Sequence, residues 1–545
     1  MVMLNYTLDE MNEVMHRKLK IEDYDRLSLK CGLDLDHGES ALNFELTSDR
    51  VDVVSRYSLA SIFASQLGIN IKRHLLIGRK NPGVAVDYTS RRFVNVIYVN
   101  LDGNIRDKID ELIAIQERLD KNVGRNRRKA AIGLFDYSKI SFPIKYHEVD
   151  SNQINFIPLG YQSSMDYASI MKELKQSKEY GNLSGKKPIV WSDKTGRILA
   201  MPPIINADSY SITKDTKELL IDITGTDKET VNAVTKILIY NLQFIGSVSL
   251  VKVNYTSKEI ATKLSLETHS FHLTEEVVRS LLGTSVKKDS IRRILLSMDY
   301  TVIQSGKDLI VRPPFYRQDV MHQVDIIDDI MRNIGVDSIK DIVPHSYTEG
   351  GFLPNHYTLQ NIREILVGFG YQEIDINALT NEKYQFDKTF INGQDYVSLL
   401  PLKSGEVTMV SKNLFPELLR LISNNLHKKF PQNIFSLSEV VEKGNSDVIF
   451  SNKTKLSVVS CQKDANVTDV LSIIKKVLAD AFPLNDLSTD YIEEGFSKTF
   501  ITGRAYTLYM NGKPVGFAGE IHPRALNAFG IELPTAIAEI YVDGL

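Results

Sequence analysis

The sequence has few cysteines and no long hydrophobic run, and both absences exclude classes of protein. Its 545 residues include two cysteines, Cys31 and Cys461, which lie far apart along the chain. They cannot form a disulfide framework or a cysteine-based zinc site, which is typical of a protein in a reducing compartment. No uninterrupted apolar stretch approaches the roughly 18 residues that indicate a membrane span. The N-terminus alternates apolar and acidic residues, unlike a signal or transit peptide, so we expect a cytoplasmic protein with no membrane partner.

Charge of neither sign dominates the composition. The chain has 65 Lys and Arg against 68 Asp and Glu, which gives a formal net charge of −3. This balance excludes a globally basic nucleic-acid coat protein but is compatible with a local basic patch. The basic run Arg-Asn-Arg-Arg-Lys at residues 125–129 could contact phosphates, or it could be a solvated loop. The sequence has neither a Gly-x-x-x-x-Gly-Lys-Ser/Thr loop nor a Gly-x-Gly-x-x-Gly motif, so those routes to nucleotide binding are unsupported.

The length predicts about three or four domains at roughly 150 residues each. Alternating helix and strand signals favour an α+β multidomain protein, with the clearest strands at residues 93–99 and 248–253. In the last part of the chain, short strands recur at a density that suggests a largely antiparallel sheet with helices on it. The pattern divides the chain into four blocks, at residues 1–85, 86–258, 264–340 and 345–545.

The block at residues 264–340 predicts the order helix, helix, strand, strand, helix. Its first helix has Thr274 as a plausible N-cap, an acidic first turn, and Gly283 at its end. The two predicted strands are residues 300–304 and 308–312. Such a unit is similar to a winged helix, an interpretation that rests on analogy.

Residues 312–335 form the most informative segment. A helix is predicted from near Val320. Asp325, Asp328 and Asp329 are spaced i, i+3 and i+4, so they should share one face, and Asp319 precedes the helix. The apolar positions expected in the core are Val320, Val324, Ile327, Met331 and Ile334. Clustered carboxylates offer the hard oxygen ligands that suit Mg²⁺. Alternatively, Asp319 is simply the helix N-cap and the others form a solvated acidic face.

This segment resembles the signature of the B5 domain in the beta subunit of phenylalanyl-tRNA synthetase. The shared pattern is Pro, aromatic, Arg, x, Asp, then His, Asp and an acidic pair before a helix that ends in Gly. Other segments resemble the same family in collinear order, and the length favours the archaeal/eukaryotic type. Residues 49–55 resemble the family's Asn-Arg-Pro-Asp segment. Residues 128–133, 156–159 and 202–206 resemble segments of the family's B3/B4 editing domain. Residues 415–419, 434–439 and 519–523 resemble segments of its catalytic-like domain.

The resemblance implies a fold for three of the blocks. Residues 86–258 would be a B3/B4-like editing domain, residues 264–340 a winged-helix-like B5 domain, and residues 345–545 a class II synthetase-like antiparallel sheet domain. It also implies an α2β2 heterotetramer in which the alpha subunit uses ATP to attach phenylalanine to tRNA(Phe). The chain has no Phe-Arg-x-Glu around residues 434–439, so we expect the last domain to lack the ATP-clamping arginines. The synthetic site would then lie on the alpha subunit, with this domain as a scaffold facing it.

The resemblance further implies a cofactor and a set of ligands. Mg²⁺ would be bound by carboxylates at the positions of Asp319, Asp325, Asp328 and Asp329. The family usually has Glu where this chain has Asp328. Because Asp is one methylene shorter, a water-bridged contact is a second option at that position.

The family's B3/B4 domain hydrolyses tRNA that carries tyrosine in error. A pocket built for phenylalanine rejects an added hydroxyl only modestly, so a second hydrolytic site improves fidelity. The family loop carries over onto Pro202, Pro203, Asn206 and Thr213 as candidate lining of that site. The competing interpretation is that the two prolines only make a rigid turn. The sequence singles out no general base.

Two other functions stay open from the residues alone. A stand-alone Mg²⁺-dependent hydrolase would use the aspartate face and would turn over without any partner. A winged-helix-like nucleic-acid-binding protein would act by itself, although near-neutral net charge weighs against it because nonspecific binding depends on phosphate neutralisation.

Overall fold

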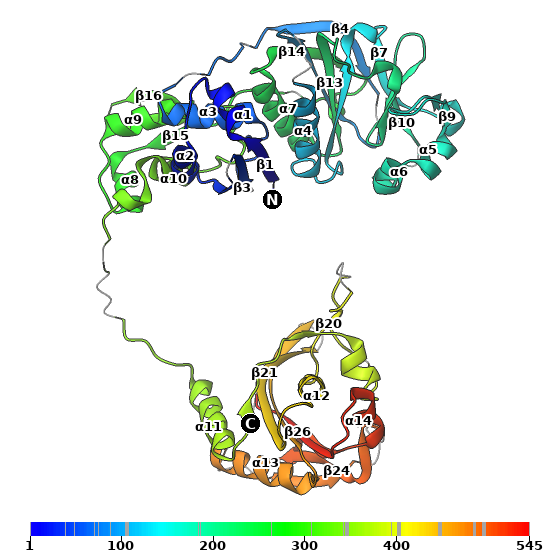
Figure 1. Cartoon of the computed structure of the whole chain (residues 1–545), viewed down its shortest axis with the longest axis vertical. Coiled ribbons are helices and arrows are strands. Elements are labelled where there is room, and N and C mark those ends of the chain that lie inside the picture. Colours follow the sequence, from blue (N-terminus) through cyan, green and yellow to red (C-terminus); the bar gives the residue numbers. More distant parts are fainter. Residues whose placement is uncertain are drawn as a thin grey trace. The chain divides into compact units, whose positions relative to one another are not determined.

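The computed structural model divides the chain into two compact units, Met1–Pro344 and His345–Leu545, which are described separately (Figure 1). Among the residues that the structure describes, no helix is long and apolar enough to cross a membrane. The structure describes residues 2–38, 40–47, 49–69, 71–74, 76–87, 89–103, 108–183, 185, 187–262, 264–306, 308–341, 343, 348–393, 395–400, 405–444, 449–482, 487–492 and 498–543.

The N-terminal block of the first unit is a small sheet with three helices. Its antiparallel strands have the order β1-β3-β2. Alternate residues Leu42, Phe44 and Leu46 of the central strand are buried, which is the period of a strand with one face on a core. The elements are β1 (Val2–Thr7), α1 (Leu8–Met15), α2 (Ile21–Cys31), β2 (Asp34–His37), β3 (Ala41–Leu46) and α3 (Arg56–Gln66).

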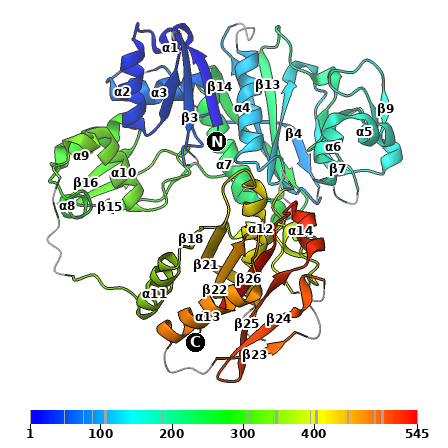
Figure 2. The same cartoon turned by 60° about the horizontal axis from the view of Figure 1, so that its bottom comes forward.

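A nine-stranded sheet follows, in the order β12-β11-β10-β7-β4-β14-β5-β13-β6. Two long helices, α4 (Ile109–Lys121) and α7 (Lys228–Leu242), pack on one face, between the sheet and the N-terminal block (Figures 1 and 2). The short helices α5 (Tyr167–Glu173) and α6 (Lys175–Tyr180) precede β10. The strands are β4 (Arg79–Val86), β5 (Phe93–Leu101), β6 (Ala130–Asp136), β7 (Ile144–Glu148), β10 (Ile189–Ser192), β11 (Ile198–Met201), β12 (Ile205–Asn206), β13 (Glu218–Gly225) and β14 (Gly246–Tyr255). The strands predicted at residues 93–99 and 248–253 are confirmed by β5 and β14.

The third block has the predicted order of two helices, two strands and a helix, preceded by a short strand, β15, that was not predicted. The Thr274 Oγ1 accepts a hydrogen bond from the backbone N of Val277, and Gly283 ends the helix with a φ of 67°, as expected of an N-cap and a C-terminal glycine. Both predicted strands are present, in a three-stranded sheet of order β15-β17-β16. The elements are β15 (Phe271–Leu273), α8 (Glu275–Leu282), α9 (Lys288–Ser297), β16 (Thr301–Ser305), β17 (Asp308–Arg312) and α10 (Gln323–Ile334).

The prediction for the last helix of this block was partly wrong. α10 begins at Gln323, and its N-cap is His322, so Asp319 is not the cap. The buried apolar residues of α10 are Ile326, Ile327 and Ile330, whereas Val324 is 44% exposed. Val320, Ile327 and Ile334 pack in this core as predicted, and Ile326 and Ile330 join them, so the apolar face is wider than predicted.

The second unit is built on a seven-stranded sheet of order β18-β21-β22-β26-β25-β24-β23, antiparallel except for the β18–β21 pair. This confirms the largely antiparallel sheet. Helices α11 and α13 pack on one face and α12 and α14 on the other, because neighbouring residues of β22 such as Val458 and Val459 belong to different cores. The main elements are α11 (Pro354–Gly368), β18 (Gln372–Glu373), α12 (Phe415–Asn424), β21 (Gln432–Lys443), β22 (Phe450–Cys461), α13 (Val467–Ala481), β23 (Leu487–Tyr491), β24 (Phe500–Met510), β25 (Lys513–Ile521), α14 (Pro523–Phe529) and β26 (Thr535–Tyr541).

Candidate functional site

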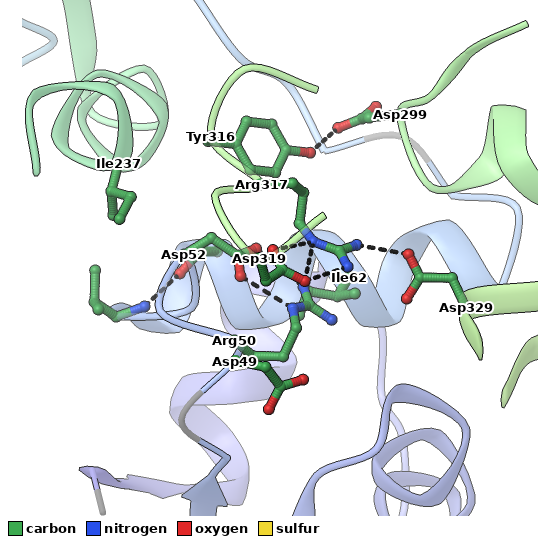
Figure 3. A network of polar contacts seen from close by, with 12 residues as sticks. Asp49, Arg50, Asp52, Ile62, Ile237, Asp299, Tyr316, Arg317, Asp319 and Asp329 are labelled. Carbon is green, nitrogen blue, oxygen red and sulfur yellow. Dashed lines mark hydrogen bonds and ion pairs between the residues drawn. The ribbon is translucent and has the colours of Figure 1, made fainter. Parts of the chain in front are cut away.

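Two of the four predicted metal ligands, Asp319 and Asp329, form ion pairs with Arg317 (Figure 3). Arg317 lies in the segment between β17 and α10. Its Nε lies 2.8 Å from Oδ1 of Asp319, and its Nη1 lies 2.9 Å from Oδ2 of Asp329. Tyr300 also donates to Oδ2 of Asp329, at 2.6 Å. Arg317 and Asp329 are 6% and 4% exposed, so the guanidinium occupies the place between these carboxylates where a cation would otherwise be needed.

The other two predicted ligands face outward and act separately. Oδ2 of Asp325 accepts the backbone N–H groups of Met321 and His322, both at 2.8 Å, and so caps α10. Oδ2 of Asp328 lies 2.8 Å from Nε of Arg332. Burial raises the pKa of Asp328, and the nearby Arg332 only partly opposes this. The three helix aspartates are spaced on one side of α10 as expected, but they do not form a uniformly solvated face, since Asp329 is buried and Asp325 and Asp328 are partly exposed.

The four aspartates do not converge on one point in this structure. Among the described residues there is no group of three or more His, Cys, Asp or Glu side chains placed to hold a metal ion. A complete four-carboxylate cage does not fit this arrangement. Asp325 and Asp328 each make these contacts through Oδ2, so the Oδ1 atom of each carboxylate remains as a possible ligand of a metal ion. Mg²⁺ usually takes only one or two protein carboxylates beside water or phosphate, so these two residues are enough for a simpler site.

A second buried ion pair lies beside this network. Nε and Nη2 of Arg50 lie 3.0 Å from the two carboxylate oxygens of Asp52 (Figure 3). Burial alone would raise the pKa of Asp52, but Arg50 outweighs it and holds that pKa below its ordinary value. Nδ2 of Asn241, on α7, donates to the backbone O of Asp52 at 3.1 Å. Residues 49–52 thus connect the N-terminal block with the large sheet's covering helix.

A small cavity of about 130 Å³ opens on the large sheet and collects three of the four predicted editing residues. Pro202, Pro203 and Asn206 line it. The prolines lie in the turn between β11 and the edge strand β12. Thr213 is not part of this cavity. Its Oγ1 lies 3.5 Å from the hydroxyl of Thr216 in the turn before β13.

The sequence did not single out the most unusual group in this cavity, which is Asp222 in the middle of β13. Its carboxyl group is 2% exposed. Nε1 of Trp191 donates to Oδ2 at 3.0 Å, but Oδ1 has no hydrogen-bond partner in the described part of the chain. Burial raises the pKa of Asp222 to about 7. Thr224 lines the same cavity two residues later, on the same side of the strand.

Gly133 on the neighbouring strand β6 lies directly against this carboxyl group. A Cβ at that position would lie 2.1 Å from Oδ1 of Asp222, closer than any real contact. Only glycine therefore leaves Oδ1 its place beside the cavity. The strand pairing puts Gly133 opposite Asp222, a relation between distant segments that the sequence could not show.

Arg127, from the basic run, is turned toward this cavity. Its Nε lies 2.9 Å from Oδ2 of Asp120, and its Nη1 donates to the backbone O of Pro203 at 3.0 Å. Its guanidinium also lies over the ring of Tyr180, 4.7 Å from the centroid. Burial raises the pKa of Asp120 to about 7, with Arg127 opposing the shift. Arg127 therefore holds the proline turn in position.

Known proteins are similar to this chain in both of its units. The family model of the tRNA synthetase B5 domain matches residues 271–336, and that of the phenylalanyl tRNA synthetase beta chain CLM domain matches residues 339–542. The phenylalanine--tRNA ligase beta subunits of Pyrococcus furiosus and Pyrococcus abyssi are 30% and 31% identical over 556 residues, 98% of this chain and 98% of theirs. The chain belongs to the phenylalanine--tRNA ligase beta-subunit family. The resemblance to this family is thereby confirmed, and with it the mixed α+β fold.

A solved structure covers the first part of this beta-subunit family member. The crystal structure of an N-terminal fragment of the phenylalanyl-tRNA synthetase beta subunit from Pyrococcus horikoshii is similar, with a TM-score of 0.55 and 26% sequence identity. It covers 61% of this chain and 99% of the fragment.

Proposed function

We propose that the chain acts as the beta subunit of an enzyme that attaches phenylalanine to tRNA(Phe), and that its own chemistry is hydrolysis of tRNA charged with tyrosine. Family membership supports the first part. The alpha subunit, in an α2β2 assembly in the cytoplasm, would form the new ester with ATP. The division into a B3/B4-like block at 86–258, a winged-helix-like B5 block at 264–340 and a class II synthetase-like block at 345–545 belongs to the same proposal.

A buried ion pair on the sheet of the second unit supports a scaffold role. Lys455 and Glu539 are 3% and 1% exposed and lie 3.6 Å apart, Nζ to Oε1. Oε2 of Glu539 accepts the backbone N–H groups of Leu414 and Phe415 at the start of α12, both at 2.9 Å. A buried lysine committed to glutamate is a poor clamp for the phosphates of ATP. This favours a synthetic site on the alpha subunit.

The observation that carries the editing proposal is the buried carboxyl group of Asp222, which has one unpaired oxygen and belongs to a residue that lines the cavity with Pro202, Pro203 and Asn206. A phenol hydroxyl can donate to this oxygen, whereas the phenylalanine ring would leave it unpaired. Leaving a buried polar group unpaired costs about 1–3 kcal/mol, and a site built around a substrate hydroxyl discriminates strongly against the analogue that lacks it. The pocket therefore favours tyrosine, the residue that must be removed.

The hydrolysis itself needs few protein groups. Water adds to the ester carbonyl, the bond to the ribose oxygen breaks, and that oxygen leaves as the hydroxyl of the tRNA after taking a proton. In this arrangement Asp222 binds the hydroxyl of the tyrosine side chain and Asn206 helps line the cavity. Arg127 positions the turn that contains Pro202 and Pro203. The structure assigns no general base.

Mg²⁺ belongs to the proposal in a narrower form than the sequence predicted. Asp325 and Asp328 would hold the ion through their outward oxygens, directly or through water. Asp319 and Asp329 would support α10 through Arg317. The ion would supply positive charge at the surface of the B5-like block.

The test uses the complex of this chain with its cognate alpha subunit. We expect phenylalanine charging only when both chains are present. Asp222→Ala and Asn206→Ala should slow deacylation of tyrosyl-tRNA(Phe), by about 10–100-fold for Asp222, and leave phenylalanine charging unchanged. If no phenylalanine charging occurs with either chain alone or with the two mixed, the subunit assignment is contradicted. Equal loss of charging and deacylation would assign these residues to folding and not to editing.

A further inference from the structure

A second cavity, of about 490 Å³, lies in the first unit of the chain. Its floor is apolar and includes Val53, Val54 and Leu119. The N-terminal block contributes residues 46–54 to it, and the C-terminal half of α4 and the turn after it contribute the opposite wall. The volume is that of an ordinary ligand site.

The rim of this cavity is positively charged. Among the described residues that line it, four are basic, Arg50, Arg118, Arg125 and Lys129, and none is acidic. Arg50 is committed to Asp52, and Arg118 lies 3.5 Å from Glu111. Lys129 has a partly exposed partner in Asp227, 3.5 Å away. The side chain of Arg125 is exposed to solvent. Three of the four basic side chains thus have an acidic partner, and Arg125 supplies the positive charge that has no ion pair among the described residues.

The basic turn (residues 125–129) separates the two cavities. Arg127 lines the editing cavity, whereas Arg125 and Lys129 line the basic one. Helix α4 shows the same division, with Gln116 at the first cavity and Arg118 at the second. The two cavities thus lie on the two sides of this turn, and a ligand in one would be separated from a ligand in the other by the turn.

The backbone of this turn is held in an uncommon conformation. Arg125, Asn126 and Arg127 have φ values of 51°, 53° and 60°, in the left-handed region that non-glycine residues rarely occupy. Backbone hydrogen bonds close the turn onto the end of α4, for example from Arg127 N to Asp120 O at 3.0 Å. Such conformations persist only where the surroundings hold them, and they concentrate at functional sites.

We propose that this basic cavity binds the RNA strand next to the aminoacylated end, with Arg125 and Lys129 contacting a phosphate and a base resting on the apolar floor. The proposal rests on the proposed editing function and adds where the RNA lies. An RNA whose 3′ ester enters the editing cavity must place its preceding nucleotides nearby. Basic side chains with an adjacent apolar surface suit single-stranded RNA.

The test compares two substrates in the complex with the alpha subunit. One is tyrosyl-tRNA(Phe), and the other is 3′-O-tyrosyl-adenosine, which has the ester but no phosphate. Arg125→Glu and Lys129→Glu should each lower the ratio of kcat/KM for the tRNA over that for the nucleoside by about tenfold, through KM. The dependence of log KM for the tRNA on log salt should also flatten by about 0.7 for each phosphate that is no longer neutralised.

The matched control is Arg128→Glu, since Arg128 has the same charge in the same turn, is exposed, and lies outside the lining of both cavities. Its substrate ratio should equal that of the unmodified complex. Equal ratios for Arg125→Glu, Lys129→Glu and Arg128→Glu would overturn the RNA site while leaving the editing function intact. Unchanged hydrolysis of both substrates by Asp222→Ala would instead remove the editing function on which it rests.

Discussion

Removal of Arg317 should strongly destabilise the first unit. Arg317→Met leaves the carboxylates of Asp319 and Asp329 close together without a countercharge, 11% and 5% exposed at their side chains. Breaking a buried pair in this way costs about 3–5 kcal/mol. The control is Arg332→Met, because the Arg332–Asp328 pair is more exposed, at 27% and 40%, and should contribute less than about 1 kcal/mol. Urea unfolding measures both, and equal losses would contradict the central position of Arg317.

Asp222 should make stability depend on pH in a definite direction. The ordinary pKa of an aspartate is 3.8, whereas burial raises the pKa of Asp222 to about 7 in the fold, so the folded protein keeps the proton longer. The stabilisation is fully present below about pH 4 and is lost as pH rises through 7. A difference of about three pKa units corresponds to at most ~4 kcal/mol. Asp222→Asn removes this titration, so its stability relative to the unmodified protein should rise between about pH 4 and pH 8. Urea unfolding at the two pH values measures this difference in stability between Asp222→Asn and the unmodified protein. The same difference at about pH 4 and pH 8 would exclude a titrating carboxyl group at Asp222.

At the scale of the helix, Asp325 combines a cap with a proposed metal ligand, and the two roles can be separated. Asp325→Ala removes the acceptor of two backbone N–H groups and should cost about 1 kcal/mol without any metal. Asp328→Ala makes no such change to the helix start. If both hold Mg²⁺, the ion should raise the thermal midpoint of the unmodified protein but not that of the double variant. The thermal midpoints are measured with Mg²⁺ and, as the reference, with EDTA. An equal change of the midpoint in the unmodified protein and in the double variant would show that Asp325 and Asp328 are a solvated acidic face.

The same helix and its neighbours separate what is predictable from sequence from what is not. The N-cap Thr274 and the element order of the third block were predictable, because caps and periodicity are local properties. The orientation of α10 was not, because Arg317, outside the helix, draws Asp329 inward. The lining residues at 202, 203 and 206 were found through their loop. Asp222 was missed because β13 is buried on both faces, so its polar position breaks no visible alternation, although an aspartate within an apolar strand is itself a signal.

On the scale of the whole chain, the two units keep separate hydrophobic interiors. Every cluster of buried apolar residues in the described ranges belongs either to the part before residue 345 or to the part after it. The editing cavity and the basic cavity both lie in the first unit. A unit with its own core has what it needs to fold alone.

We therefore expect residues 1–344 to fold and to retain the proposed hydrolytic activity without the rest of the chain. The fragment should unfold cooperatively in urea and hydrolyse 3′-O-tyrosyl-adenosine at a rate within about tenfold of the complex, since no lining residue is removed. Mixed with the alpha subunit, it should not support charging, because the second unit is the proposed scaffold. Asp222→Ala in the fragment is the control for contaminating esterases. A fragment that unfolds without a cooperative transition would show instead that the first unit depends on the second for its stability.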